Sequence, residues 1–364
     1  MSLFRRRSKL TAFRLCQCSL SLSVFLFSAD AAAMELAFID LTVFDRNIEK
    51  NVSNIESSDF VPRATLFYSN TFGNTKFLAE FAANSNHSHF GRFKLGWDLD
   101  STNTIWVGRT HNPSNYWRDQ YHHGGWLQPS INRPAIAEFE VPGGIIPAHS
   151  TGLLYEGGAT VGNQRGWAYI ASYGYTATLD SNGLELPNII DTERNRHNAS
   201  LAFKLSYRFE ALAGGNEIGI LGSNNHITDR DNAIIENEQS LFGAFFNWHF
   251  SDLHIISELY FIENNLVNFS SVINGTDEFV NGYIMADYGL NDDWSVYSRL
   301  ENTKNEEGSL YLGRFLNFVT KRNLLGIRYS INRSQMLKLE IEDSEIFAGD
   351  QYQQLSLQWS YVYP

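Results

Sequence analysis

Short segments in which apolar and polar residues alternate recur along this 364-residue chain, and they constrain its fold more than any other feature. Three examples are LAFKLSYRFE (201–210), LKLEIE (337–342) and LSLQWSYVYP (355–364). Alternation over this length predicts β-strands with one apolar and one polar face. Mixed charges occupy the polar positions, as expected for side chains that face a wet lumen. The pattern therefore favours a transmembrane antiparallel β-barrel over a soluble β-sandwich, whose strands also alternate.

Sixteen such segments can be placed on the chain. They lie near residues 34–44, 62–71, 75–83, 89–99, 103–110, 150–158, 165–179, 198–210, 215–223, 239–250, 252–262, 278–290, 293–302, 321–331, 334–343 and 352–363. Short polar connections follow the even-numbered segments, and long connections follow nearly all the odd-numbered ones. Short and long connections therefore lie at opposite ends of the predicted barrel. This arrangement is typical of bacterial outer-membrane barrels. We predict a loop over 303–320, because a strand there would break the alternation of short and long connections.

The amino-terminal segment predicts a secretory signal peptide over residues 1–31, with cleavage after residue 31 or as late as residue 33. Basic residues precede an apolar run that is shorter than the roughly 20 residues of a spanning helix. Both cysteines, Cys16 and Cys18, lie in this segment, so the predicted exported part, residues 32–364, has no disulfide. That part carries 23 basic and 39 acidic residues, a net charge of −16, which argues against nucleic-acid binding.

Aromatic residues gather at the predicted strand ends that border the short turns. We expect them to form a girdle at one membrane boundary. They are Trp97, Trp248, Phe250, Tyr288, Trp294, Tyr329, Tyr361 and Tyr363.

The stretches GLNDDWSVYSRLE (289–301) and RNLLGIRYSINRSQMLKLEIE (322–342), together with the signal and the aromatic last strand, resemble Gram-negative porins of sixteen strands. Residues 108–150 are also similar to a loop of uncharacterised proteobacterial porin-like proteins. The resemblance implies an outer-membrane channel for passive diffusion of small hydrophilic solutes, without enzymatic activity or cofactor. It further implies contact with outer-membrane lipids, recognition by the barrel-assembly machinery and a homotrimer. Pro364 departs from the pattern, since an aromatic residue usually ends such chains.

The third external connection is the longest, and the resemblance implies that it folds into the lumen and narrows the pore. Its tryptophans and tyrosines alternate with turn-forming glycines and prolines, which also favours a packed position. The charges expected near the constriction are Arg109, Arg118, Asp119, Arg133, Glu138 and Glu140. These charges nearly balance, so we predict weak ion selectivity.

The polar parity of the strands supplies the remaining charges that we expect to line the pore, where they set the field across a channel. They are Arg92, Lys94, Lys204, Arg208, Glu258, Arg299, Glu301, Arg328, Lys338, Glu340 and Glu342.

Three other functions remain open. A lumen filled by the long connection would make a plugged structural or adhesion barrel. A hydrolase would need a catalytic pair such as His254 with Glu258, although these residues suit a charged lining better. A metal site could use His111, His122, His123 and His149, but adjacent histidines on an extended backbone point to opposite sides, and we predict no metal.

Overall fold

The computed structural model describes residues 34–49, 55–85, 88–121, 124–140, 143–180, 183–185, 198–211, 214–229, 236–270 and 273–363. The predicted signal peptide, His122, His123 and Pro364 lie outside the described residues.

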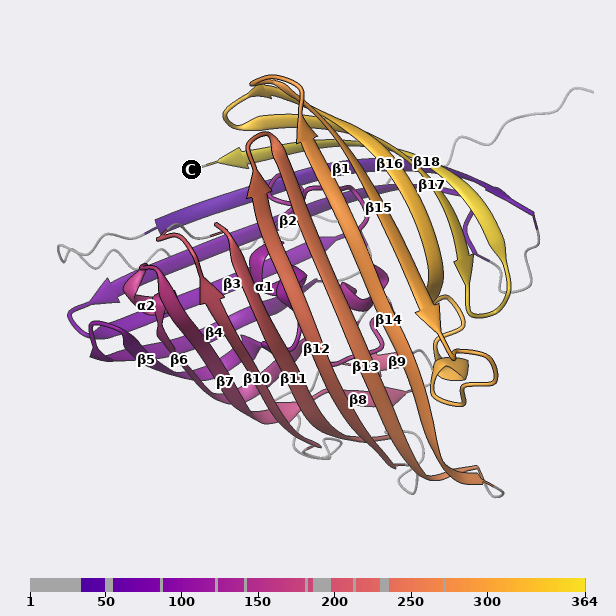
Figure 1. Ribbon diagram of the computed structural model, residues 1–364, viewed down its shortest axis with the longest axis horizontal. Coiled ribbons are helices and arrows are strands. Elements are labelled where there is room, and N and C mark those ends of the chain that lie inside the picture. The colour runs from indigo at the N-terminus through magenta and orange to yellow at the C-terminus, as the bar shows by residue number, and fades with distance from the viewer. Residues whose placement is uncertain are drawn as a thin grey trace, which may run out of the picture. The chain divides into compact units, whose positions relative to one another are not determined.

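Sixteen antiparallel strands form one closed barrel (Figure 1). They are β1 (Met34–Ile48), β2 (Ser58–Phe72), β3 (Thr75–Asn84), β4 (Ser88–Asp100), β5 (Asn103–His111), β6 (His149–Gly158), β7 (Gly166–Thr176), β10 (Asn198–Arg208), β11 (Glu217–Thr228), β12 (Glu236–Phe250), β13 (Leu253–Ser270), β14 (Ile273–Gly289), β15 (Trp294–Lys304), β16 (Val319–Asn332), β17 (Gln335–Ile346) and β18 (Gln351–Tyr363). The predicted fold class is confirmed.

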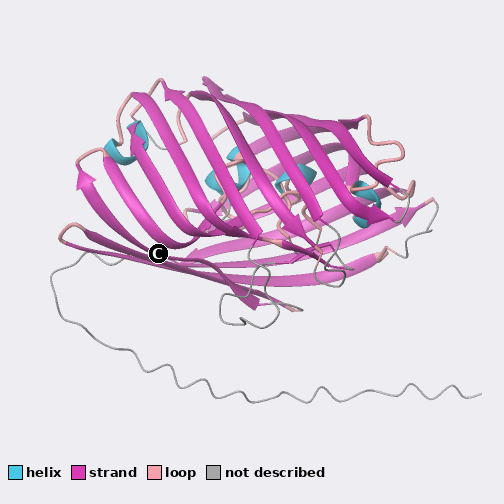
Figure 2. Ribbon diagram, turned by 90° about the horizontal axis from the view of Figure 1, so that it is seen from below, coloured by secondary structure: helices cyan, strands magenta, loops and turns pink. Residues whose placement is uncertain are grey.

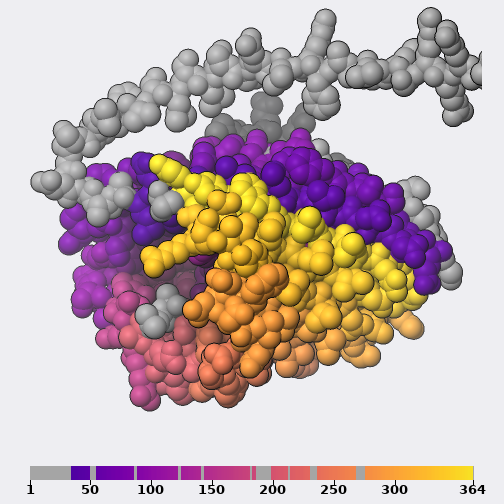
Figure 3. All heavy atoms as spheres, turned by 90° about the horizontal axis from the view of Figure 1, so that it is seen from above, coloured from indigo at the N-terminus to yellow at the C-terminus, as the bar shows by residue number. Residues whose placement is uncertain are grey.

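The barrel closes between its first and last strands. β1 pairs with β18 in an unbroken register from Ala37 opposite Tyr363 to Ile48 opposite Tyr352. Figure 3 shows the indigo first strand lying directly beside the yellow last one. Every barrel strand therefore has two bonded neighbours, as hydrocarbon surroundings require.

Short elements occupy the connections. They are α1 (Tyr116–Tyr121), a 3₁₀ turn η1 (Ala135–Ala137), α2 (Ala159–Gly162), a hairpin of β8 (Thr178–Asp180) with β9 (Gly183–Glu185), and a 3₁₀ turn η2 (Leu312–Arg314). Figure 1 shows α1 among the barrel strands, and the perpendicular view in Figure 2 shows cyan helical turns between the strands. Among the described residues, no helix is long and apolar enough to cross a membrane.

All sixteen predicted segments correspond to barrel strands, and several boundaries need correction. β1 runs to Ile48, β2 begins at Ser58 and β11 runs to Thr228, so these strands are longer than predicted. The segment predicted over 165–179 ends at Thr176, and its last residues belong to the β8–β9 hairpin. The connection predicted over 263–277 is mostly strand, because β13 runs to Ser270 and β14 begins at Ile273. There the outer face carries polar residues such as Glu263, opposite Glu278, so the apolar–polar alternation disappears although the strands continue.

The two faces of the strands differ as the alternation predicted. On β18, Leu355 and Leu357 are about half exposed, whereas Ser356 and Gln358 are buried inside. Several predicted girdle residues are exposed on the outer face, including Trp97, Phe250 and Tyr363. Trp294 stacks on Tyr329, with ring centroids 4.5 Å apart. The apolar outer face is the surface that a barrel presents to lipid.

On the inner face, two large rings lie over glycines of the neighbouring strand. Trp106 pairs with Gly96, and Tyr297 pairs with Gly326. A Cβ atom added to Gly326 would lie 2.2 Å from the Tyr297 ring, which is buried. The glycine therefore makes the space that the ring fills.

We expect Gly326→Ala to destabilise the barrel by about 1–3 kcal/mol, because the buried ring must move or clash. Denaturant unfolding in detergent, followed by heat-modifiable gel mobility, measures the loss. Gly289→Ala is the matched control, since its nearest neighbour would be an ordinary 3.7 Å away. Equal stability of the two variants would contradict this role for Gly326.

Candidate functional site

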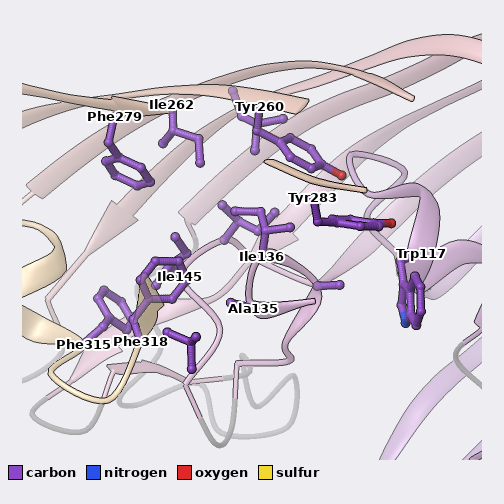
Figure 4. Close-up of a cluster of buried hydrophobic side chains, with 14 of the residues drawn as sticks. Trp117, Ala135, Ile136, Ile145, Tyr260, Ile262, Phe279, Tyr283, Phe315 and Phe318 are labelled. Atoms are coloured by element: carbon purple, nitrogen blue, oxygen red, sulfur yellow. The ribbon is translucent and has the colours of Figure 1, made fainter. Parts of the chain in front are cut away.

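The inner wall of the barrel carries apolar and polar side chains together. Inward side chains of β11 to β14 include buried apolar residues, among them Leu241, Phe245, Ile262, Phe279 and Met285, which alternate with buried polar ones such as Gln239 and Asn281. The apolar ones belong to one cluster with residues of two connections, 112–148, hereafter the long loop, and 305–318 (Figure 4). A lumen wall of this kind packs as a protein core does.

Aromatic contacts join the long loop to the apolar side chains of β12 and β14. Tyr116 stacks on Phe245, with ring centroids 4.4 Å apart and planes at 17°. Trp117 meets Tyr283 edge-on at 5.8 Å. Farther along, the Tyr311 hydroxyl of the second connection donates to the carbonyl of Ile145 at 2.7 Å. The two connections therefore pack together on the same side of the barrel interior.

A buried carboxylate on β13 holds the start of the long loop. Glu258 accepts the backbone N–H groups of Tyr116 and Trp117 at 2.8 and 3.0 Å. It also accepts the hydroxyls of Tyr260 and Tyr283. The two N–H groups belong to the first turn of α1 and have no partner within the helix, so the carboxylate satisfies them and gains donors for its own buried charge.

Charges from β1 and β17 hold the middle of the long loop. Asp40 accepts the N–H of Gly125 at 2.8 Å, and the Lys338 ammonium donates to the carbonyl of Gln128 at 2.6 Å. Glu340 accepts the N–H groups of Ile131 and Asn132 at 2.9 and 3.2 Å. Each strand side chain thus replaces a hydrogen bond that water would otherwise supply.

The next part of the long loop is bound by β15 and β16. Arg299 donates to the carbonyl of Asn132 at 2.8 Å, and Arg322 donates to the carbonyl of Arg133 at 2.8 Å. Glu301 accepts the N–H of Ala135 at 2.7 Å and forms ion pairs with both arginines.

Glu140, a residue of the long loop itself, stabilises the end of that loop. The carboxylate accepts the N–H groups of Ala148 and His149 and lies 3.0 Å from the His149 ring nitrogen Nδ1. Burial opposes ionisation of this carboxyl, but the charge and hydrogen bond of His149 outweigh it and lower the pKa of Glu140 to about 2.

Most of the charges predicted to line the pore are buried. Those buried are Lys94, Arg118, Arg133, Glu140, Lys204, Arg208, Glu258, Arg299, Glu301, Lys338, Glu340 and Glu342. The strand members Lys204, Glu258, Arg299, Glu301, Lys338 and Glu340 bind the long loop directly, so they cannot act as freely exposed lining. The predicted residues that keep partial exposure are Arg92, Arg109, Asp119, Glu138 and Arg328.

Several predicted residues have local partners. Arg92 pairs with Glu80 at 2.6 Å, Asp119 pairs with Lys204, and Arg328 pairs with Asp287 at 2.7 Å. Glu342 pairs with Arg322 at 3.3 Å, and the Lys94 ammonium lies 4.1 Å from the Trp106 ring centroid.

Two further predicted residues, Arg208 and Arg109, also have partners outside the long loop. Arg208 pairs with Glu217 and donates to the carbonyl of Ala159, beside the short α2 turn. Arg109 donates to the carbonyl of Phe90 and lies opposite Phe93, whose ring is exposed on the outer face.

Sequence reasoning missed several charged residues on the inner face, namely Asp40, Arg63, Glu80, Glu217, Asp287 and Arg322. Each occupies the polar parity of a correctly predicted strand, so the same rule could have identified them. It also missed Tyr260 and Tyr283, which look like ordinary apolar strand residues until Glu258 is placed between them. Among the described residues, no group of three or more His, Cys, Asp or Glu side chains is arranged to hold a metal ion.

Comparison with solved structures identifies the architecture. The fold is similar to an anion-selective porin from Comamonas acidovorans, with a TM-score of 0.62 and 11% identity over 92% of this chain and 100% of that one. It is also similar to OmpF of Salmonella typhi in a complex with daunomycin, with a TM-score of 0.60 and 12% identity over 91% and 97% of the two chains. OmpT of Vibrio cholerae gives a TM-score of 0.60 and 10% identity over 93% and 99%.

No family model and no curated protein matches the chain. The likeness to solved structures therefore defines the fold, which is that of a sixteen-stranded outer-membrane porin. A closed barrel of this type with an apolar outer face belongs in the bacterial outer membrane.

We expect Glu258→Gln to loosen the start of the long loop, because a neutral amide accepts the converging N–H and O–H donors less well. Amide hydrogen exchange over residues 115–121 should accelerate by about 10- to 100-fold. Glu263→Gln is the matched control, because it removes an outward-facing carboxylate from the same strand. Unchanged exchange in Glu258→Gln would mean that Glu258 does not hold the loop.

Proposed function

We propose that the protein is an outer-membrane channel for passive diffusion of small hydrophilic solutes, narrowed by its long loop. The observation that carries the proposal is the series of hydrogen bonds from the long loop to inward-facing charges on β1, β13, β15, β16 and β17. A loop tied to the inner wall restricts the lumen without unfolding when solutes pass.

In this proposal the aqueous path runs along the part of the inner wall that the two connections leave uncovered. The charges that would meet a passing solute are those with partial exposure, Arg92, Asp119, Glu138 and Arg328. The buried charges act indirectly, by holding the long loop in place. This assigns two roles to residues that the sequence alone treated as one set.

A plugged barrel is the second candidate, and a specific observation favours it. The cluster around Ile136, Ile145, Phe279 and Phe315 fills one side of the interior with apolar side chains (Figure 4). If the long loop closes the remaining side as well, the barrel would serve a structural or adhesive role.

Catalysis forms no part of the proposal. Glu258, the carboxylate considered with His254, is 1% exposed and binds the long loop, so it is not available to a substrate. His254 instead stacks on His249 with centroids 4.0 Å apart and lies 2.7 Å from the side-chain oxygen of Asn247.

We also propose a homotrimer surrounded by outer-membrane lipids and inserted by the barrel-assembly machinery. One of the similar solved structures is a trimer form of Vibrio cholerae OmpT. A monomer in native gels after mild detergent extraction would argue against the trimer.

Purified protein in planar bilayers should give discrete conductance steps, and deletion of residues 115–140 should raise the step size clearly by widening the path. Heat-modifiable gel mobility confirms that each sample is folded. A folded wild-type barrel without current would favour the plugged candidate. A folded deletion variant with unchanged conductance would place the long loop outside the path.

A further inference from the structure

The second inward connection, residues 305–318 and hereafter the strap, is longer than its position requires. It joins β15 to β16, which are neighbours in the barrel and which a turn of about two residues could connect. Instead, its Arg314 contacts Asp180, at the end of β8, and Asp229, just after β11. In the barrel order, β12, β13 and β14 separate β11 from β15. The strap therefore reaches past three strands at the end of the barrel that carries the long connections.

Apolar side chains hold the strap inside the barrel. Four of them are buried, namely Tyr311, Leu312, Phe315 and Phe318. They belong to the cluster of Figure 4, together with the inward-facing Phe279 of β14. The Phe315 ring also lies against the β8–β9 hairpin, where a Cβ atom added to Gly183 would be 3.2 Å from it. The strap thus packs as part of the protein interior and does not extend into solvent.

The root of the strap is bound to β14 and to the long loop. The Asp277 carboxylate accepts the Ser309 hydroxyl at 2.6 Å and the N–H of Tyr311 at 2.9 Å. The Tyr311 hydroxyl donates to the carbonyl of Ile145, and the side-chain amide of Gln239, a buried inward residue of β12, donates to the same carbonyl at 3.1 Å. Gln239 therefore lies beside the junction of the strap with the long loop.

The tip of the strap is bound by charge. The Arg314 guanidinium donates to the carbonyl of Asp180 at 2.9 Å and forms an ion pair with Asp229 at 3.2 Å. The Asp229 side chain is 2% exposed, whereas that of Arg314 is 30% exposed. Loss of the guanidinium would remove a cation from a buried carboxylate, which disfavours the closed position of the tip.

We propose that the strap is a second constriction, which covers the external mouth of the channel and limits the size of the solutes that enter. The contacts of Arg314 at its tip hold it closed. This inference rests on the proposed function and deepens it, because it adds a size-selecting element to the narrowing made by the long loop. Two narrow segments in series each restrict flow, so removal of one leaves the limit set by the other.

The tip contacts are tested by comparing Arg314→Gln with Arg333→Gln in protein that also carries Gln239→Cys. Arg333 is the matched control, because it is an exposed arginine in the turn between β16 and β17, at the opposite end of the barrel. The predicted exported part has no cysteine, so the introduced thiol is read without background. When a small maleimide is added outside intact cells, Arg314→Gln should accelerate labelling by about tenfold or more, because the strap opens more often, and Arg333→Gln should change it by less than about twofold.

Swelling of liposomes that contain the purified protein measures the size limit. A variant in which Asn-Gly replaces residues 306–317 should raise the ratio of raffinose to arabinose entry by about threefold or more, because the larger sugar is restricted most. Heat-modifiable gel mobility confirms that the variant is folded. If no sugar enters any sample but labelling depends on Arg314, the channel proposal fails and the strap stands. Equal labelling of the two arginine variants, or an unchanged ratio in a folded replacement variant that admits sugar, would overturn the strap.

Discussion

Backbone hydrogen bonding in a lipid environment is the constraint on which the rest of this structure depends. A strand in hydrocarbon has no water to satisfy its peptide groups, so every strand needs a neighbour on both sides and the sheet must close. Pairing of β1 with β18 achieves this closure. Once the sheet is closed, alternate residues must face lipid and the others must face the interior, which explains why leucines and phenylalanines cover the outside while glutamates and lysines point inward.

The inward charges would be costly if they were buried without partners, since an unpaired buried ion destabilises a protein by several kcal/mol. The long loop supplies those partners. Its N–H groups donate hydrogen bonds to Asp40, Glu258, Glu301 and Glu340. Its carbonyls accept hydrogen bonds from Arg299, Arg322 and Lys338. Loop and wall therefore stabilise each other, because each satisfies polar groups that the other buries. The apolar contacts on β11 to β14 add a second attachment that does not depend on charge.

The sequence predicted the barrel well because its signal is local and repeated. A segment such as LAFKLSYRFE or LKLEIE shows by itself which residues lie on the apolar and the polar face of its strand. The alternation of short and long connections then reveals a wrongly placed strand. Prediction failed where the apolar–polar pattern disappears, as beyond Glu263, where β13 continues past the apolar belt. The roles of inward charges were harder to predict, because nothing near Glu258 or Lys338 in the sequence indicates that a loop more than a hundred residues away binds them.

Position of the long loop inside the barrel is the central claim, and disulfide trapping in native outer membranes tests it most directly. The predicted exported part has no cysteine, so an introduced pair is read without background. Asp40→Cys with Gly125→Cys joins the inner wall to the loop, and Thr42→Cys with Gln358→Cys, two residues already in hydrogen-bond contact across β1 and β18, reports closure of the barrel. The account predicts that both pairs oxidise in the folded protein. Formation of the wall pair while the loop pair stays reduced would contradict it.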